Sequence, residues 1–249
     1  MIDHIDLASI LFLDIETVSA QPSYEDLSET FQKLWANKGR QALRLSPEDM
    51  TPELISSSYK DKAAIFAEYG KIVCISVGIM HRDKEDQKLR LRLKSFANED
   101  EAILLEEFKE LLLQYKSIKY ICGHNVKEFD VPYMCRRMVV NQMTLPPALD
   151  LYGKKPWETK HLLDTLELWK FGDRKNFTSL KVLAAVLDFP SPKDDIDGSQ
   201  VGRVFWEEGD LDRIAFYCEK DVLATVQLFL RYRRMPILEE EQVHHVERE

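Results

Sequence analysis

The sequence predicts an α/β protein in which helices flank a mixed five-stranded sheet. Two observations lead to this prediction. Apolar, β-branched runs of strand length alternate with segments of helical periodicity, and two neighbouring runs are joined as a hairpin while later ones are separated by helices. The chain of 249 residues fits one large domain or two small ones, and its composition, 45% hydrophobic and 31% charged, is that of an ordinary globular protein.

The first predicted strand, Ile10 to Val18, carries two acidic residues after an apolar start. Apolar residues fill both faces of its first half, which is typical of a strand covered on both sides. Side chains two apart in a strand share a face, so Asp14 and Glu16 can reach one cation, which would offset the cost of burying two carboxylates. The same stretch also fits a strand that ends at Asp14 and leaves both acids in water.

Four further strands complete the predicted sheet. They lie at residues 71–80, 89–96, 118–122 and 161–164. The first two are joined as a hairpin by a charged segment. Helical periodicity predicts helices at about residues 98–115, 130–140, 178–187, 199–207 and 210–233.

The segment between the first two strands is long and polar. We expect residues 19–70 to form a helical insertion beside the core. Apolar residues at helical spacing occupy 24–34, and helix-starting sequences with proline in the first turn stand at 46–48 and 51–53. Residues 63–69 add another helical turn. A covering flap over a site is an alternative role for this insertion.

Charge and cysteine usage limit the functional classes. The net charge of −9 argues against a broad basic face for duplex nucleic acid, but it allows a local site in which metal ions carry the positive charge. The cysteines lie apart with no C-x-x-C pair, so we expect reduced, buried thiols and a cytoplasmic protein. The N-terminus lacks the basic start of a signal peptide, and no apolar run is long enough to span a membrane.

An acidic loop from Asp194 to Gly198 resembles a calcium loop only superficially. With Gly198 at the turn position, the first and last ligand positions fall on Lys193 and Val204, where carboxylates are required. We interpret the segment as a solvated loop in which Asp197 or Ser199 caps the next helix.

The predicted domain ends before the last residues of the chain. Asp210 caps the final long helix, which closes a single domain of residues 1–235. Residues 236–249 are expected to be an acidic tail, with His244 and His245 in solvent.

The final helix carries an acid beside its apolar stripe. Tyr217 and Asp221 stand four apart, so they share one helical face next to the stripe. An acid in this position is unusual unless something pairs with it. A third acidic site is Asp130, which precedes Val131-Pro132, where an ordinary N-cap would stand. The stripe consists of Leu211, Ile214, Cys218, Val222, Thr225 and Phe229.

Together, three segments resemble the three motifs of the DEDD 3′–5′ exonuclease superfamily, in the DEDDy subgroup with tyrosine in the third motif. Asp14-Ile-Glu-Thr17 is similar to the first motif, and Tyr217-x-x-x-Asp221 is similar to the third. The second, Gly-His-Asn-x-x-x-Phe-Asp-x-Pro-Tyr, has the form seen in proofreading domains of family-B DNA polymerases. The resemblance covers about residues 10–232 and implies a ribonuclease H-like fold; the insertion at 19–70 departs from the family pattern.

The resemblance implies phosphodiester hydrolysis with two divalent cations, Mg²⁺ or Mn²⁺, about 4 Å apart. Asp14, Glu16 and Asp221 would hold the first ion, and Asp14 would bridge to the second. Asp130 would act on the second ion directly or through water. Tyr217 would orient the attacking water, since a tyrosine pKa near ~10 makes a poor general base at neutral pH.

Substrate contacts are also suggested. Asn125 and Phe129 could hold and stack the terminal nucleotides, and the backbone of Thr17 could meet the 3′ end. Phe129 fits a core position equally well, and Asp164 fits either a supporting role at the site or a solvated strand end. Candidates for phosphate contact, or for plain solvated charge, are Arg136, Arg137, Arg174, Lys175 and Lys181.

We therefore expect a metal-dependent 3′–5′ exonuclease acting on single-stranded ends, with DNA favoured. Trimming of RNA 3′ ends is the close alternative, because discrimination depends on contacts to the 2′-hydroxyl that a sequence does not display. A non-catalytic nucleic-acid-binding module on the same fold is a second alternative, which loss of a metal carboxylate would favour. The third is an unrelated α/β protein whose acids only cap helices. Association with replication or repair proteins is not derivable from the sequence.

Overall fold

A mixed sheet of six strands runs through the molecule in the order β5-β4-β1-β2-β3-β6. The computed structural model describes residues 2–46, 49, 51–173, 177–190 and 196–246. The strands are β1 (Ile10–Ser19), β2 (Gly70–Arg82), β3 (Leu89–Ala97), β4 (Tyr120–Gly123), β5 (Leu162–Asp164) and β6 (Val243–His245). The helices are α1 (Glu29–Leu43), α2 (Pro52–Lys62), α3 (Glu101–Gln114), α4 (Asp130–Val140), α5 (Thr165–Lys170), α6 (Leu180–Val186), α7 (Val201–Arg203) and α8 (Leu211–Tyr232).

Strand β1 is the centre of this sheet. It pairs antiparallel with β2 along nearly its whole length, but it pairs parallel with β4 only over Ile10 to Phe12. The β2–β3 pair is the predicted hairpin. Short parallel strands form the two edges, β5 beside β4 and β6 beside β3. Strand β1 continues beyond Asp14 to Ser19, so the alternative in which the strand ends at Asp14 and leaves both acids in water is wrong.

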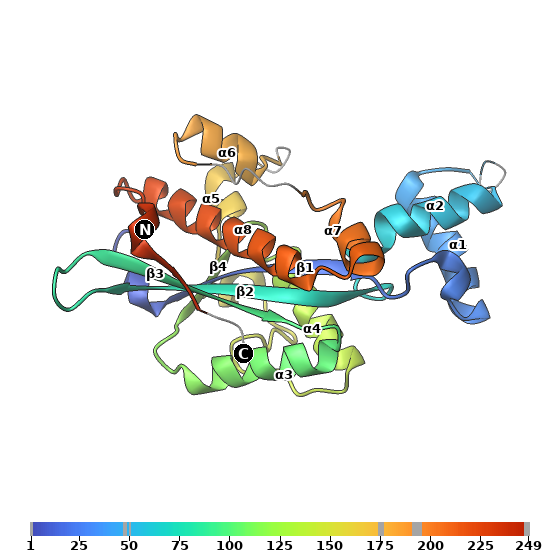
Figure 1. Ribbon diagram of the computed structural model, residues 1–249, viewed down its shortest axis with the longest axis horizontal. Coiled ribbons are helices and arrows are strands. Elements are labelled where there is room, and N and C mark those ends of the chain that lie inside the picture. The colour runs from blue at the N-terminus through green and yellow to red at the C-terminus, as the bar shows by residue number, and fades with distance from the viewer. Residues whose placement is uncertain (1, 47–48, 50, 174–176, 191–195, 247–249) are drawn as a thin grey trace.

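Alternate side chains of β1 enter different cores on the two faces of the sheet. Leu11, Leu13 and Ile15 pack with residues of α3 and α4. Phe12 packs with residues of α8 on the opposite face. Figure 1 shows this layering, with α8 on one side of the sheet and α3 and α4 on the other. Side chains alternate along a strand, so Asp14 and Glu16 point to the face covered by α8.

The C-terminal segment expected to be an acidic tail supplies the sixth strand. Strand β6 pairs parallel with β3, and Leu238, just before it, is 5% exposed. The side chain of Gln227 on α8 donates to the Leu238 carbonyl oxygen (2.8 Å) and accepts from its amide (2.9 Å). His244 and His245 are both exposed, as expected, but Nδ1 of His245 also lies 2.5 Å from an oxygen of the buried Glu219.

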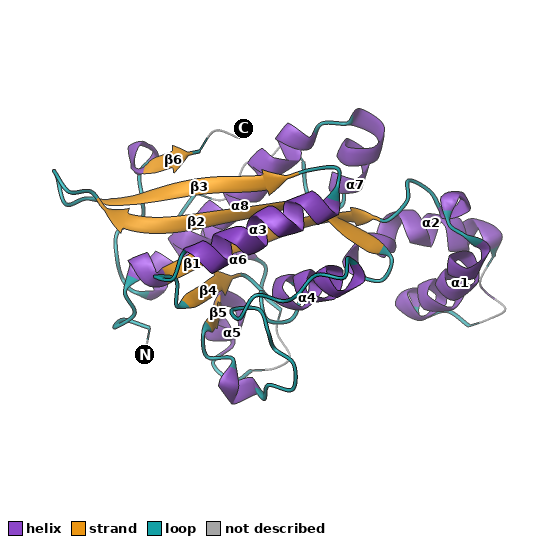
Figure 2. Cartoon of the chain, turned by 90° about the horizontal axis from the view of Figure 1, so that it is seen from below, coloured by secondary structure: helices purple, strands orange, loops and turns teal. Residues whose placement is uncertain are grey.

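Helices α1 and α2 occupy the segment expected to be a helical insertion. Thr51 caps α2 and Pro52 is its first residue, as predicted, but the helix expected at 24–34 is a 3-10 turn followed by α1. The pair has its own small core around Trp35 and Tyr59, both fully buried, with ring centroids 5.3 Å apart. Figure 2 shows the two helices projecting beyond one end of the sheet. The other predicted helix start is at residues 46–48, of which Pro47 and Glu48 lie outside the described residues.

Helix boundaries differ from the predictions by a few residues elsewhere. The helix predicted from about residue 98 begins at Glu101 instead, because Asp100 caps α3 with a side chain that accepts from the Ala102 amide. After the acidic loop, of which Asp194 and Asp195 lie outside the described residues, α7 runs into a π-helical turn over Val204–Glu208. Among the helices that the structure describes, none has both the length and the apolar character needed to cross a membrane.

Candidate active site

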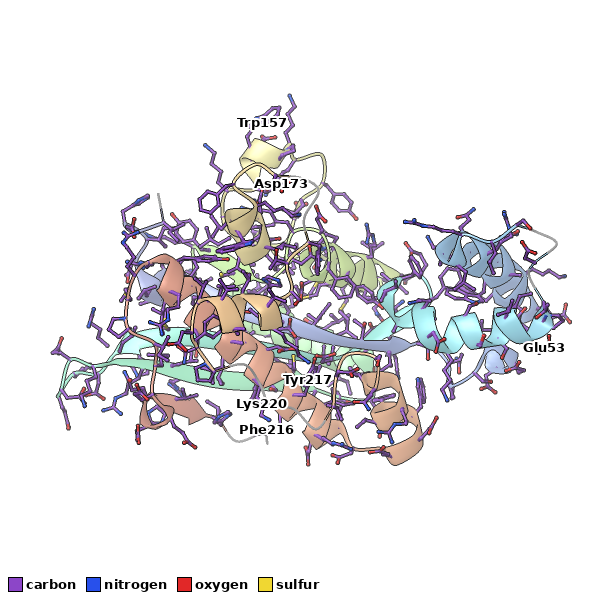
Figure 3. The ribbon with its side chains drawn as sticks, turned by 90° about the horizontal axis from the view of Figure 1, so that it is seen from above. Glu53, Trp157, Asp173, Phe216, Tyr217 and Lys220 are labelled. Carbon is purple, nitrogen blue, oxygen red and sulfur yellow. The ribbon has the colours of Figure 1, made fainter. Side chains whose placement is uncertain are left out.

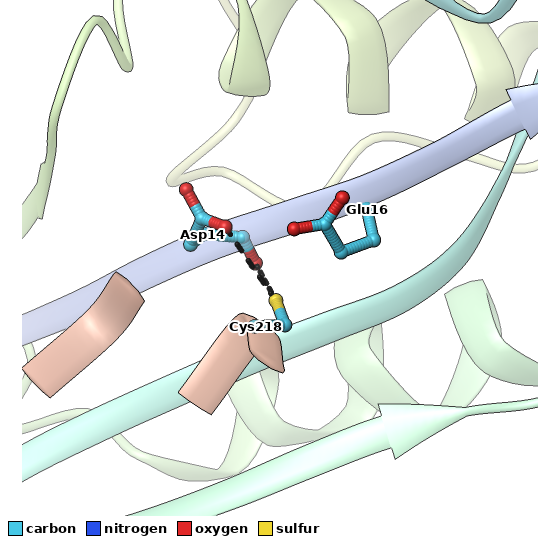
Figure 4. A group of neighbouring side chains, drawn as sticks. All are labelled: Asp14, Glu16 and Cys218. Carbon is cyan, nitrogen blue, oxygen red and sulfur yellow. Dashed lines mark hydrogen bonds between the residues drawn. The ribbon is translucent and has the colours of Figure 1, made fainter. Parts of the chain in front are cut away.

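Two carboxylates of β1 form the centre of the site. Oxygen atoms of Asp14 and Glu16 and the sulfur of Cys218 on α8 all lie within 4.8 Å of one another (Figure 4). Glu16 is 8% exposed, and Asp14 is half-buried. The predicted juxtaposition of the two acids on one face is thus present, and α8 covers it.

Cys218 is a member of this group that the sequence did not single out for a role. Its thiol lies 3.4 Å from the carbonyl oxygen of Asp14 and 3.6 Å from a carboxylate oxygen of the same residue. Burial raises the pKa of Cys218 well above its usual range, with nearby Cys74 and the two acids of β1 adding to the effect. The sulfur therefore stays a neutral thiol that donates to Asp14. Its position in the apolar stripe, between Tyr217 and Asp221, was the available signal.

Asp130 is not the N-cap that the sequence allowed. It is the first residue of α4, whose N-cap is Phe129, and its side chain is 3% exposed. Burial raises its pKa to about 7, while the backbone amide of Ile15 on β1 opposes the shift. Strand β4 has stopped pairing with β1 by this point, so Asp130 approaches a free stretch of β1 backbone.

Electrostatic repulsion links the acids of all three segments. Burial raises the pKa of Asp14 well above its usual value, and the charges of Asp130, Asp221 and Glu16 raise it further. Asp130 and Asp221 are not members of the tight group around Asp14, so the four predicted carboxylates lie near one another without forming one compact set.

Tyr217 lies on α8 (Figure 3), close enough to Asp14, Glu16 and Asp221 for their charges to act on it. It is 8% exposed and forms part of the core between α8 and the sheet. Burial raises its pKa far beyond the usual range for tyrosine, as do the charges of Asp221, Glu16 and Asp14 and a hydrogen bond with Asp221. The hydroxyl is therefore protonated at any physiological pH.

Asp164 holds the loop that leads to Asp130. The Asp164 carboxylate is 4% exposed and accepts from the backbone amides of Asn125 (3.1 Å) and Lys127 (3.0 Å). It also caps α5 by accepting from Leu166 and Glu167. Of the two interpretations considered, the solvated strand end is wrong. Asn125 adopts a left-handed conformation at φ 69°, which asparagine tolerates better than most residues.

The three predicted substrate contacts differ in their surroundings. The hydroxyl of Thr17 donates to the carbonyl oxygen of Ala64 at the end of the insertion, 2.9 Å away. Phe129 is partly buried against the core and tilted on Tyr133, with ring centroids 5.4 Å apart. Asn125 borders a cavity of about 410 Å³ that extends to α5.

The candidate phosphate contacts have mixed outcomes. Arg137 is a structural residue, because its guanidinium binds the buried Glu101 (2.6 Å) and the carbonyl oxygen of Ala67 (2.8 Å). Arg136 borders an apolar cavity on the outer side of α4, and Lys181 is exposed on α6. Arg174 and Lys175 lie outside the described residues.

The fold and the carboxylate group define a mixed α/β domain whose central strand presents acids beneath a long C-terminal helix. The chain belongs to the family described as "Predicted 3'-5' exonuclease related to the exonuclease domain of PolB", which matches residues 65–247. Asp130, Tyr217 and Asp221 fall inside this match, whereas Asp14 and Glu16 precede it. The predicted resemblance to polymerase proofreading domains is confirmed.

A solved structure shows the same fold. The family B DNA polymerase from the hyperthermophilic archaeon Pyrobaculum calidifontis is similar with a TM-score of 0.51 and 15% sequence identity, over 90% of this chain. The chain spans 24% of the length of that polymerase chain. The ribonuclease H-like fold is thereby confirmed, with six strands instead of five. No curated protein matches the chain.

Proposed function

We propose that this protein is a metal-dependent 3′–5′ exonuclease that removes nucleotides from the 3′ end of single-stranded nucleic acid, with DNA favoured. The observation that carries the proposal is the gathering of acids from β1, α4 and α8 around Asp14. Asp130 and Asp221 lie close enough to Asp14 to raise its pKa, as does Glu16. Family membership supports the direction of hydrolysis.

The acids fit hard divalent cations. Every charged group that shifts the pKa of Asp14 is another carboxylate, and all three raise it, so negative charge is concentrated around this residue. Carboxylate oxygens are the ligands that Mg²⁺ and Mn²⁺ prefer. We propose that Asp14, Glu16 and Asp221 hold one ion and that Asp14 and Asp130 hold a second. When bound, the two ions would stabilise charge on the attacking and leaving oxygens of the phosphodiester.

The neighbouring side chains would position the reacting groups. Tyr217 would donate or accept a hydrogen bond that orients the attacking water, because its hydroxyl does not ionise in the working pH range. Cys218 would hold the Asp14 carboxylate through the thiol contact.

Asn125, Phe129 and Thr17 would contact the terminal nucleotides. Thr17 would do so through its backbone, because its hydroxyl already donates to Ala64. Phe129 is partly exposed and could offer a ring surface for base stacking. We further propose that the described chain is one exonuclease domain, with the insertion at 19–70 as an elaboration and with β6 as part of the sheet.

The test is incubation of the purified protein with 5′-labelled single-stranded DNA and RNA in Mg²⁺, Mn²⁺ or EDTA. Stepwise shortening from the 3′ end that depends on metal and is lost in Asp14→Ala supports the proposal. The two substrates decide between DNA and RNA. Binding of both without shortening, with wild-type protein and metal, would instead support the non-catalytic module.

The metal assignment has its own test. Asp14→Ala and Asp221→Ala should each weaken Mn²⁺ binding in titration calorimetry. Asp210→Ala, at the cap of the same helix, is the matched control and should bind Mn²⁺ normally. Unchanged Mn²⁺ binding in both of the first two variants contradicts the assignment.

A further inference from the structure

A second group of charged side chains lies away from the acids, around a cavity of about 450 Å³ at the start of β4. Lys116 and Lys119, in the segment between α3 and β4, border it together with Lys154 and His161 from the segment before β5. Tyr115 and Tyr120 are its aromatic members. No acidic residue borders this cavity among the residues that the structure describes. We call it the lysine cavity.

The lysines of this cavity are free to meet an anion. All three are exposed, and none takes part in the ion pairs found within the described parts of the chain. The protein as a whole carries a net charge of −9. A local excess of unpaired positive charge in an acidic protein is therefore a specific feature, and it suits a polyanion.

Aromatic side chains stand next to these charges. Tyr115 is 49% exposed at the cavity. Trp157, three residues beyond Lys154, is 64% exposed, and Lys155 lies over its ring at 5.2 Å. Figure 3 shows Trp157 at the outer edge of the molecule, with Asp173 beside it in that view. Lysines interleaved with exposed rings match the chemistry of single-stranded nucleic acid, in which charged phosphates alternate with stacking bases.

Strand β5 runs from the lysine cavity to the cavity beside Asn125, a residue that we propose contacts the substrate. His161 stands directly before β5 and borders the lysine cavity. Asp164 is the last residue of β5 and borders the cavity beside Asn125. The strand has three residues, which corresponds to roughly 10 Å. Because β5 is an edge strand, no further strand of the sheet separates the two cavities. A nucleic-acid strand a few nucleotides long can cover this distance.

We propose that the lysine cavity and the loop carrying Trp157 bind the 5′-ward part of the single strand whose 3′ end is degraded. This inference rests on the proposed function. It predicts a preference for long substrates, because a strand of a few nucleotides can fill the catalytic site but cannot reach the lysine cavity.

The test compares wild type with Lys116→Ala/Lys119→Ala/Lys154→Ala. The matched control is Lys33→Ala/Lys84→Ala/Lys88→Ala, which removes the same charge from exposed positions on α1 and the β2–β3 hairpin. Binding of fluorescein-labelled oligo(dT) of about 25 nucleotides, longer than the ~4–16 that a single-strand-binding fold covers, is measured by anisotropy in EDTA. Metal is then added to measure kcat/KM on this oligonucleotide and on one of about 4 nucleotides.

We expect the cavity variant to bind the long strand at least about tenfold more weakly than wild type. The slope of log K against log salt should fall by about 2, since each phosphate contact on a single strand contributes about 0.7. Its kcat/KM should drop on the long substrate and stay near wild type on the short one. The control should resemble wild type in every measurement, and circular dichroism should show that both variants are folded.

The outcomes separate the two proposals. If the protein degrades both substrates and the cavity variant keeps wild-type binding and length preference, the lysine cavity has no such role while the exonuclease stands. If the protein binds the long strand through these lysines but shortens nothing, the exonuclease proposal fails and the binding surface stands without its link to degradation. A wild-type protein that neither binds nor degrades oligo(dT) or its RNA counterpart overturns both.

Discussion

The thiol of Cys218 donates to Asp14, with the sulfur 3.6 Å from a carboxylate oxygen and 3.4 Å from the carbonyl oxygen of the same residue. The contact joins α8 to β1 at the most crowded point of the acidic site. Among the causes that shift the pKa of Asp14, this hydrogen bond is the one that lowers it, whereas burial and three neighbouring carboxylates raise it.

Replacing Cys218 by alanine should therefore raise the pKa of Asp14 further. A hydrogen bond of about 1 kcal/mol corresponds to a little less than one pH unit. The affinity for Mn²⁺, measured by calorimetry between about pH 5 and pH 8, falls as the ligands become protonated at low pH. The pH at which it falls should rise by roughly that amount. Cys218→Ser keeps a donor and should stay near wild type. If the pH dependence of Mn²⁺ affinity is unchanged in Cys218→Ala, the thiol does not lower the pKa of Asp14.

Tyr217→Phe should lower kcat on the order of 100-fold, the usual size of a well-placed proton or water contact. Mn²⁺ binding should persist, because the carboxylates are untouched. The control is Phe216→Leu, since Phe216 is 51% exposed on the adjacent position of α8 and lies away from the acids. Loss of metal binding in Tyr217→Phe would show that the hydroxyl holds the site together and does not orient water.

Asp130 should make the metal-free protein less stable as the pH rises. Its pKa is about 7 in the folded chain and 3.8 as the ordinary value, so the folded state binds more protons between these values. The free energy of unfolding then falls from about pH 4 to about pH 7, by at most about 4 kcal/mol, and levels off above. The Asp14 carboxyl acts in the same direction.

The measurement is urea unfolding in EDTA from about pH 4.5 to 8, with Asp130→Asn as comparison. The stability difference between Asp130→Asn and wild type should grow in favour of the variant as the pH rises. Added Mg²⁺ should stabilise wild type most at the high end of this range, because the ligands must be ionised. A wild-type protein that gains stability relative to the variant over this range would sink the prediction.

Asp164→Ala should destabilise the protein by about 2–4 kcal/mol, because it leaves the buried amides of Asn125 and Lys127 without an acceptor and removes the cap of α5. It should also reduce kcat, since the loop before Asp130 loses its anchor. Asp210→Ala removes a comparable cap from α8 and should cost about 1 kcal/mol without the loss of activity. If both variants change kcat equally, Asp164 does not position the loop before Asp130.

His245→Ala should destabilise the protein by about 1–2 kcal/mol, because the buried carboxylate of Glu219 keeps only its hydrogen bond from Ser95. His244→Ala changes the exposed neighbour on the same strand and should stay within about 0.5 kcal/mol of wild type. Chemical denaturation midpoints decide the comparison. Equal midpoints for the two variants would mean that β6 contributes nothing through this contact.

Local patterns were sufficient for most of the secondary structure. The hairpin of β2 and β3, the caps at Thr51 and Asp210 and the apolar stripe of α8 follow from residue spacing and capping chemistry, which act over a few residues. Strand β6 was not predicted, because a segment of three residues has too little sequence pattern to indicate a strand. Their pairing depends on β3, about 150 residues earlier in the chain.

The sequence by itself determined that Asp14 and Glu16 share a face, because strand geometry has a period of two. It also determined that Tyr217 and Asp221 share a helical face. Only the tertiary structure decided that these two faces meet, with Cys218 between them, and that Asp164 and Arg137 are structural residues. The physical reason is range: periodicity fixes directions within one element, whereas the packing of α8 against β1 fixes which side chains share one buried, low-dielectric space.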